Sequence, residues 1–243
     1  MKRYQSLLFG VFTLGLGAAC QDPGARVSHT DQQIAPWMVA NNNHLAKVRF
    51  LDEDHQPSGD GWLRLCNGKD LTGWNRRIAD RPVSYKVEDG VLKNIPQEGT
   101  RGNDIYTDAK FEDFEIYYEY RILEGSNSGV YLRGRYEIQV LDDYGTPPST
   151  SSNGAIFGQC APSSNASAQF GEWQSVRAKI VGRQVTVILN KVKVIDAFIL
   201  PGPTGGAMDE EEHLPGPILL QGDHGPVEYR NLYLRPIVSR DGN

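Results

Sequence analysis

Apolar and polar residues alternate along most of the chain beyond Asp60, whereas amphipathic helical periods are almost absent. The clearest alternation covers 114–122, where an aliphatic or aromatic side chain occupies every second position. Because successive side chains of a strand point to opposite faces, this pattern predicts a long, half-buried strand. Further strands are predicted at 172–181, 183–190, 192–198, 217–221 and 227–235. Many strands separated by turn signals indicate an all-β sandwich or jelly roll.

Turn and loop signals divide these strands. Asp89-Gly90 lies between two short apolar runs, and this dipeptide is strongly favoured in a two-residue β-hairpin. The segments 143–171 and 199–216 are longer than a simple connection requires. We therefore expect both loops to wall a site.

The pair of strands joined at Gly134-Arg135 carries an unusual number of polar residues. With a period of two, Tyr131 and Arg133 lie on one face of the first strand. On the second strand, Glu137 and Gln139 share a face. A tight hairpin would bring the two faces together, although a slip of one residue would separate them. The mixture suits the binding of hydroxyl and carbonyl groups, and the alternative is an ordinary solvated sheet face.

Six motifs follow one another in the chain: NGKDLTGW at 67–74, EDGVLK at 88–93, NSGVYLRGRYEIQVLD at 127–142, GAIFGQCAPSSNAS at 154–167, PGPTGGA at 201–207 and PILLQGDHGPVEYRNLYL at 217–234. In this order they resemble the bacterial family known as DUF1080. The resemblance spans about residues 59–237 and implies a concanavalin A-like lectin/glucanase sandwich, a jelly roll with a concave ligand-binding sheet. It also implies 3-keto-disaccharide hydrolase activity, or 3-keto-glucoside 1,2-lyase and hydratase activity. Because one fold supports many functions, the substrate depends on the residues of the site.

The first 20 residues are typical of a secretion signal, with two basic residues before an apolar core that is too short to span a bilayer. Gly17-Ala18-Ala19-Cys20 predicts lipidation of Cys20, and so a lipoprotein of the periplasm or outer membrane. The alternative is cleavage before Cys20 and a free periplasmic or secreted protein. Residues 21–58 are predicted to form a polar linker with two short apolar pieces, and 238–243 a tail.

Composition narrows the class of protein further. The 243 residues carry a formal net charge of −5, and no Lys/Arg stripe or recognition motif indicates a nucleic-acid surface. The length suits one sizeable domain. Beyond the signal, Cys66 and Cys160 can form a disulfide in an oxidising compartment, whereas the resemblance favours a buried free thiol at Cys66.

The carboxylates of the predicted site argue against ordinary glycoside hydrolysis, which needs a pair about 5–5.5 Å apart for retention or about 6.5–9.5 Å apart for inversion. Glu137 is followed on its own face by Gln139 and Leu141, and Asp142 faces the other way unless a bulge turns it. Cleavage of a 3-keto sugar requires fewer carboxylates. Its ketone acidifies the hydrogen at C2, so one base, one acid and a group that stabilises the enolate suffice for β-elimination, and water then adds to the enone.

Three residues are predicted to be catalytic. Glu137 is the leading candidate for the base, and the alternative is a surface glutamate paired with an arginine. His224, in a tight loop after a predicted strand, can act as acid or base, although a loop histidine is often inert. Arg133 is suited to hold an enolate or sugar hydroxyls, and its alternative is a structural ion pair.

Other side chains are predicted to bind substrate. Asn127, Gln139 and Gln221 can read sugar hydroxyls, and Tyr131, Tyr144 or Trp74 can stack on an apolar sugar face, although a tryptophan in LTGW is more often part of the core. A divalent cation held by Glu137 and His224 would stabilise the enolate, but no dense ligand spacing is present and the site can equally work without metal. The DEEEH run at 209–213 resembles a cation cluster, although solvated acidic loops are commoner.

The favoured function is therefore an envelope enzyme that cleaves 3-keto-glycosides by elimination and hydration, with net hydrolysis. It would act after a glycoside 3-oxidoreductase that supplies the keto sugar. The alternatives are a lectin-like module that binds glycans without turnover, a conventional glycoside hydrolase, and a purely structural sandwich.

Overall fold

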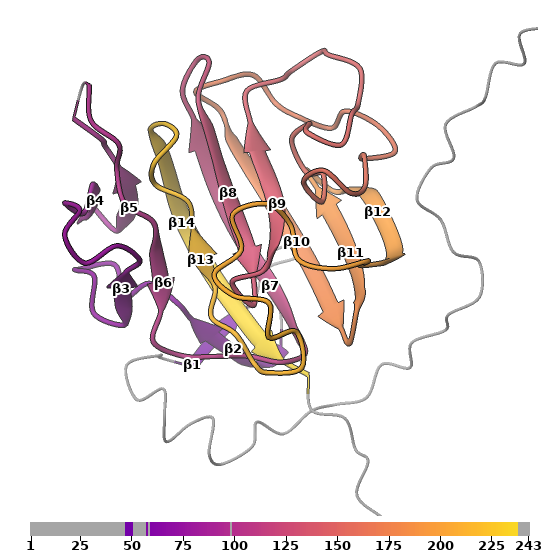
Figure 1. Cartoon of the computed structure of the whole chain (residues 1–243), viewed down its shortest axis with the longest axis horizontal. Coiled ribbons are helices and arrows are strands. Elements are labelled where there is room, and N and C mark those ends of the chain that lie inside the picture. Colours follow the sequence, from indigo (N-terminus) through magenta and orange to yellow (C-terminus); the bar gives the residue numbers. More distant parts are fainter. Residues whose placement is uncertain (1–46, 51–56, 58, 98, 238–243) are drawn as a thin grey trace, which may run out of the picture.

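The structure, a computed structural model, describes residues 47–50, 57, 59–97 and 99–237 (Figure 1). Within these ranges the chain forms fourteen strands and no helix. No helix in the described part of the chain is long and apolar enough to cross a membrane. The predicted signal segment 1–20, the lipidation of Cys20 and the tail 238–243 lie outside the described residues.

The strands follow one another as β1 (Lys47–Phe50), β2 (Gly59–Arg64), β3 (Trp74–Arg76), β4 (Tyr85–Glu88), β5 (Val91–Asn94), β6 (Ile105–Thr107), β7 (Phe114–Ile122), β8 (Asn127–Leu132), β9 (Tyr136–Leu141), β10 (Trp173–Val181), β11 (Gln184–Leu189), β12 (Val192–Ile199), β13 (Leu219–Leu220) and β14 (Val227–Pro236). All the pairings between them are antiparallel. The strands predicted from alternation at 114–122, 172–181, 183–190, 192–198, 217–221 and 227–235 correspond to β7 and β10 to β14.

Two sheets form the layers of a sandwich (Figure 1). A nine-stranded sheet runs in the order β1-β2-β14-β7-β10-β11-β12, with β5 paired to β14 and β4 to β5. A five-stranded sheet runs in the order β3-β6-β13-β8-β9. The predicted all-β sandwich of jelly-roll type is confirmed.

The core lies between the two sheets, and strict alternation builds it. Every second residue of β10 is buried, and β7 contributes Phe114, Ile116, Tyr118 and Tyr120 to the same apolar cluster. From the five-stranded sheet, alternate residues of β8 and β9 enter this cluster, so their neighbours point to the outer face. Burial of this many apolar side chains is the main force that holds the layers together.

Local signals fix several connections. Asp89 and Gly90 both have positive φ, 53° and 77°, as a two-residue hairpin turn between β4 and β5 requires. One of the apolar pieces of the predicted linker is β1, which pairs with β2 at the edge of the larger sheet. Cys66 is a buried free thiol, so it forms no disulfide with Cys160.

Candidate functional site

The outer face of the five-stranded sheet brings the predicted polar residues together. Tyr131 of β8 pairs with Glu137 of β9, and Gly129 pairs with Gln139. These four positions therefore share one face, as the hairpin register predicts. The row continues across the sheet, because Tyr131 also pairs with Leu219 of β13.

Glu137 is the most unusual group on this face. It is only 3% exposed, and its carboxylate lies over Gly129, where any Cβ would overlap Oε1. The Tyr131 hydroxyl lies 2.8 Å from Glu137 Oε2. Burial raises the pKa of Glu137 to about 7, the hydrogen bond from Tyr131 lowers it, and the negative charges of Asp104 and Asp223 raise it. At neutral pH this carboxyl group can therefore either accept or release a proton.

The hydrogen bonds of Tyr131 accommodate Glu137 in both protonation states. The hydroxyl lies 2.8 Å from Glu137 Oε2 and 3.0 Å from the carbonyl oxygen of Gly205, but it has a single proton to donate. When Glu137 is ionised, Tyr131 donates to its carboxylate. When Glu137 is protonated, it donates to Tyr131 and Tyr131 donates to Gly205. Tyr131 thus keeps its hydrogen bond with Glu137 in either state.

Three side-chain amides share the face of the sheet that carries this carboxyl group. Gln139 donates to Ser151 O at 3.3 Å, which connects β9 to the loop after it. Oδ1 of Asn127 and Oε1 of Gln221 are buried and have no hydrogen-bond partner within the described part of the chain. A buried acceptor without a donor is costly, so both oxygens are suited to accept hydrogen bonds from a ligand.

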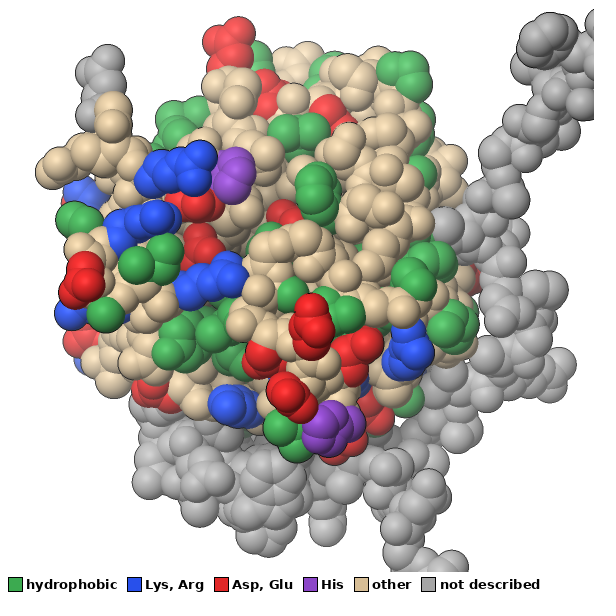
Figure 2. Space-filling model, viewed as in Figure 1, with side chains coloured by type: hydrophobic (Ala, Val, Ile, Leu, Met, Phe, Trp, Pro, Cys, Tyr) green, Lys and Arg blue, Asp and Glu red, His purple; other side chains and the backbone are tan. Residues whose placement is uncertain are grey.

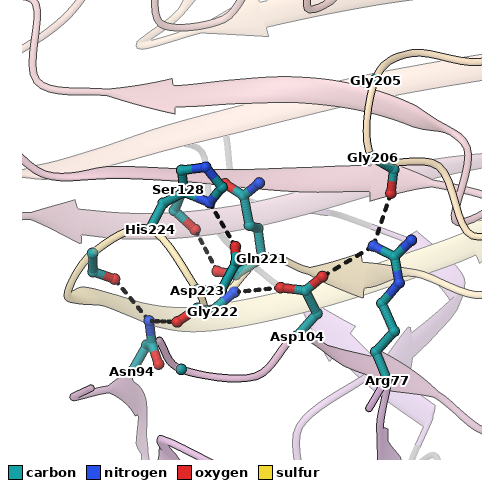
Figure 3. A network of polar contacts seen from close by, with 12 residues as sticks. Arg77, Asn94, Asp104, Ser128, Gly205, Gly206, Gln221, Gly222, Asp223 and His224 are labelled. Atoms are coloured by element: carbon teal, nitrogen blue, oxygen red, sulfur yellow. Dashed lines mark hydrogen bonds and ion pairs between the residues drawn. The ribbon is translucent and has the colours of Figure 1, made fainter. Parts of the chain in front are cut away.

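The turn that carries His224 is held from several sides (Figure 3). Tyr85 and Ser128 each donate to the carbonyl oxygen of Gln221 at 2.8 Å. Asn94 donates to the carbonyl oxygens of Gly222 and Gly225, and Asp104 accepts from the Gly222 amide. These bonds come from side chains far apart in the sequence, and they fix the position at which the histidine leaves the sheet.

His224 itself is half exposed, and its Nδ1 lies 2.5 Å from Asp223 Oδ1. When Asp223 accepts the proton on Nδ1, the neutral ring presents an unprotonated Nε2. The negative charge of Asp223 raises the pKa of Glu137, so the turn lies close enough to interact electrostatically with that carboxyl group. Figure 3 shows His224 beside Gln221 and Ser128, on the side of the network away from Arg77.

Both long loops contact the strand that carries Glu137. The loop at 199–216 supplies Thr204, whose hydroxyl accepts from the Glu137 amide at 2.9 Å, and Gly205 beside Tyr131. In the loop at 143–171, the amide of Phe157 donates to the carbonyl oxygen of Glu137. Both loops therefore lie against the strand that carries Glu137, and their role as walls of a site remains a prediction.

Arg133 is a correction to the sequence prediction, because it lies outside this face. Strand β8 ends at Leu132, and Arg133 begins a three-residue turn with a positive φ of 55°. Its guanidinium is buried and donates to Glu112 O and Gly182 O, and it pairs with Asp113 at 2.9 Å. The alternative of a structural ion pair fits Arg133, with Asp113 as the partner and not Glu137.

Tyr144 is not brought into contact with the other predicted residues. It belongs to the loop after β9 and is 55% exposed. Its ring is accessible to a ligand at the rim, but no hydrogen bond within the described residues fixes it there. The predicted stacking role of Tyr144 remains a prediction.

Comparison with known proteins assigns the chain to a family. Residues 61–235 match the family described as the 3-keto-alpha-glucoside-1,2-lyase-like domain. The chain belongs to this family. A 3-keto-disaccharide hydrolase from Bacteroides thetaiotaomicron is similar to this lyase-like domain, with 24% identity over 222 residues, which cover 77% of this chain and 76% of that protein.

Two solved structures from Parabacteroides distasonis, both described provisionally as glycosyl hydrolases, are also similar. One has a TM-score of 0.64 at 27% identity and covers 86% of this chain and 95% of its own. The other has a TM-score of 0.55 at 28% identity and covers 72% and 99%. The chain therefore contains a carbohydrate-active domain of the hydrolase or lyase type.

Reasoning from sequence missed three charged residues of the lyase-like domain. Asp104 and Asp223 lie close enough to raise the pKa of Glu137, and Arg77 pairs with Asp104 at 3.1 Å. Figure 2 shows basic side chains gathered on the flank of the molecule where β3 to β6 lie. Alternation along one strand cannot reveal groups that come from other strands. The only available signal for Asp223 was its position next to His224.

A hollow of about 360 Å³ on the nine-stranded sheet is a competing location for a ligand. Its charged lining is largely self-paired, because Arg177 pairs with Glu115 and Lys193 pairs with Asp196, each at 2.5 Å. No group of three or more potential metal ligands lies there or elsewhere among the described residues. The unsatisfied acceptors and the perturbed carboxyl group favour the outer face of the five-stranded sheet instead.

A divalent cation at Glu137 and His224 does not follow from the geometry. Within the ranges that the structure describes, no three His, Cys, Asp or Glu side chains are arranged to hold a metal ion. Metal sites of proteins usually combine more ligands than two. No step of the mechanism below therefore depends on a metal, and the cation remains a prediction.

The raised pKa of Glu137 predicts how the stability of the lyase-like domain varies with pH. The pKa is about 7 in the fold and about 4.5 in the unfolded chain, so the native state binds the proton more tightly. This contribution to stability is fully present below pH 4.5 and is lost as the pH rises through 7, and it is on the order of 3 kcal/mol. We expect the stability of Glu137→Gln not to show this decrease with rising pH.

Urea unfolding of the wild type and Glu137→Gln at several pH values between 4 and 8 measures the effect. The difference between the two free energies of unfolding isolates Glu137, because every other titrating group contributes to both proteins. Parallel curves across this range would show that Glu137 has an ordinary pKa in the fold.

Proposed function

We propose that this domain cleaves 3-keto-glycosides by β-elimination followed by hydration, with net hydrolysis of the glycosidic bond. The observation that carries this proposal is Glu137, a single buried carboxyl group with a pKa near neutrality on a face lined by unsatisfied amide acceptors. The name of the Bacteroides thetaiotaomicron relative and the family description support the same class of substrate.

The elimination step breaks two bonds. A base removes the hydrogen from C2, which the ketone at C3 makes acidic, and the electron pair forms the C1–C2 double bond as the oxygen at C1 departs with a proton. In the second step water adds its hydroxyl to C1 and a proton to C2. The sum of both steps is one water consumed and one glycosidic bond cleaved.

We assign the removal of the C2 proton to Glu137. A general base works best when its pKa is close to the working pH, and burial against Gly129 gives Glu137 that property. The Tyr131 hydroxyl donates to the ionised carboxylate, and after proton transfer it can accept from the carboxyl group and donate to the Gly205 carbonyl oxygen. Between the two steps the carboxyl proton exchanges with solvent, so the hydration step delivers a solvent-derived proton to C2.

His224 is assigned to the oxygen at C1. The ring is half exposed and its Nδ1 is held by Asp223, so when Nε2 carries a proton it can pass that proton to the departing oxygen. The amides of Asn127 and Gln221 are placed to bind sugar hydroxyls and the ketone oxygen, through their buried oxygens and their NH₂ groups. Arg133 has no part in this assignment.

Conventional hydrolysis is the alternative mechanism, because the structure does bring other carboxylates near Glu137. Asp104 forms an ion pair with Arg77 and accepts a hydrogen bond from the Gly222 amide, and Asp223 pairs with His224. Neither is free to act as the second acid or nucleophile that a glycosidase needs. This distribution of partners favours elimination.

A direct assay separates these mechanisms. We expect the purified protein to cleave a 3-keto-disaccharide and to leave the parent disaccharide intact, because only the ketone makes the C2 hydrogen acidic. In D₂O the released keto sugar should carry deuterium at C2, measured by mass spectrometry. Cleavage of the plain disaccharide alone would contradict elimination, and binding of both sugars without turnover would indicate a lectin-like module. A parallel reaction with chelator tests the predicted cation.

The location and the supplier of substrate are further parts of the proposal. The secretion signal and Cys20 support an envelope lipoprotein. A glycoside 3-oxidoreductase in the same compartment would supply the keto sugar, since the proposed substrate already carries its ketone at C3.

A further inference from the structure

Asp104 is a buried carboxylate that serves two segments at once. Its Oδ1 accepts from the Gly222 amide at 2.9 Å, and its Oδ2 lies 3.1 Å from Nη1 of Arg77. Only 11% of its side chain is exposed. One carboxylate therefore joins the turn before β14 to the residue after β3 (Figure 3).

Arg77 extends this connection to the loop at 199–216. Its Nη1 donates to Gly206 O and its Nη2 to Ala207 O, both at 2.8 Å. Its own backbone amide donates to the carbonyl oxygen of Asp104 at 2.9 Å, which fixes the two residues against each other. The planar guanidinium thus binds the carboxylate and two loop carbonyls in one geometry.

The turn before β14 and the loop at 199–216 lie on opposite sides of the candidate site. The turn at 221–226 carries His224, and the loop carries Gly205, which faces the hydroxyl of Tyr131 beside Glu137. The backbone is tightly packed both in the loop and in the turn. A Cβ at Gly206 would lie 2.5 Å from the Tyr131 hydroxyl, and a Cβ at Gly222 would overlap the carbonyl oxygen of Asn103.

We infer that Arg77 and Asp104 form a clamp that sets the spacing between the Glu137 side and the His224 side of the site. They are positioning residues, since they act through the loop and the turn and not on the sugar. This inference rests on the proposed function for its catalytic consequence, but the mechanical connection between the loop and the turn is independent of the substrate.

The decisive variant is Arg77→Met, which keeps an unbranched apolar stem and removes the guanidinium donors. Arg76→Met is the matched control, because Arg76 is the exposed preceding residue of β3. Amide hydrogen exchange followed by mass spectrometry reports both the loop and the turn in the full-length protein. We expect exchange in peptides covering 204–208 and 221–225 to accelerate about tenfold or more in Arg77→Met, and not in Arg76→Met.

Asp104→Asn provides a second test, because the amide oxygen can still accept from Gly222 while the charge that holds Arg77 is lost. Here the loop peptide should exchange faster than the turn peptide. If Arg77→Met loosens only the loop and leaves the turn unchanged, the two segments are independent and the clamp is wrong. Thermal unfolding of each variant identifies a general loss of structure, in which case Asp104→Asn and Arg77→Lys decide the matter.

Kinetics then separate positioning from simple stability. With a 3-keto-disaccharide, Arg77→Met should lower kcat by about 10- to 100-fold with a smaller change in KM, because a displacement of about 1 Å is enough to misalign a catalytic group. Arg77→Lys should recover part of kcat. Equal kcat values for Arg77→Met and the wild type would overturn the catalytic consequence. If the wild type does not turn over this substrate, the proposed function fails, and the exchange experiment still decides whether the clamp exists.

Discussion

Replacement of Glu137 by glutamine should lower kcat on a 3-keto-disaccharide by about 10²- to 10⁴-fold, the usual contribution of a group that transfers a proton. Glutamine keeps the size of the side chain above Gly129 and can still accept from Tyr131. It cannot take the hydrogen from C2. The loss should therefore appear in kcat, whereas KM should change little, because no group that binds the sugar hydroxyls is removed.

Glu124→Gln is the matched control, since Glu124 is an exposed glutamate after β7. It should retain wild-type kcat. Deuterium exchange at C2 of a keto sugar in D₂O provides an independent measure, because it reports removal of the proton even when the bond to the leaving group remains intact. A Glu137→Gln protein that still exchanges at the wild-type rate would show that another group is the base.

The hairpin of β8 and β9 shows what the sequence can predict. Alternation placed Tyr131, Glu137 and Gln139 on one face, and the structure has this register. The prediction succeeds because burial of Val130 and Ile138 in the core leaves only one register in which all apolar residues are covered. The Asp89-Gly90 turn is predictable for a similar local reason, because both positions need positive φ.

Arg133 shows where local reasoning fails. The pattern continues the strand through this residue, but the chain turns there with a positive φ, which non-glycine residues rarely adopt. The conformation persists because Glu112, Asp113 and Gly182 satisfy the guanidinium. Those partners come from two other connections, so they could not be inferred from the hairpin alone.

Arg77 and Asp104 show the same limit at longer range. Neither residue stands in a motif that suggests chemistry, and their partners Gly206 and Gly222 are more than one hundred residues away in the chain. The sequence predicted that the loop at 199–216 walls a site, but it gave no means of identifying what holds the loop in place. Such contacts become visible only when the sandwich brings β3, β6 and β13 together.

Replacement of His224 by alanine is expected to be the second severe loss, again about 10²- to 10⁴-fold in kcat if its Nε2 passes the proton to the leaving oxygen. The turn should survive the change, because the side chains that fix it, Asn94, Ser128 and Asp104, bind its backbone and not the imidazole. The effect should depend on the leaving group. A substrate whose aglycone departs without protonation, such as a nitrophenyl group, should lose much less activity than a disaccharide.

The exposure of His224 allows a sharper test of the same assignment. Since nearly half of its side chain is accessible, free imidazole can enter the space that His224→Ala leaves, and we expect added imidazole to restore part of kcat. His213→Ala is the matched control, because His213 is 73% exposed in the acidic loop and pairs only weakly with Glu211 at 3.6 Å. That variant should keep full activity and show no response to imidazole. If His224→Ala is fully active on the disaccharide, proton transfer to the leaving oxygen must come from Glu137 itself or from water. Elimination would then require only the carboxyl group.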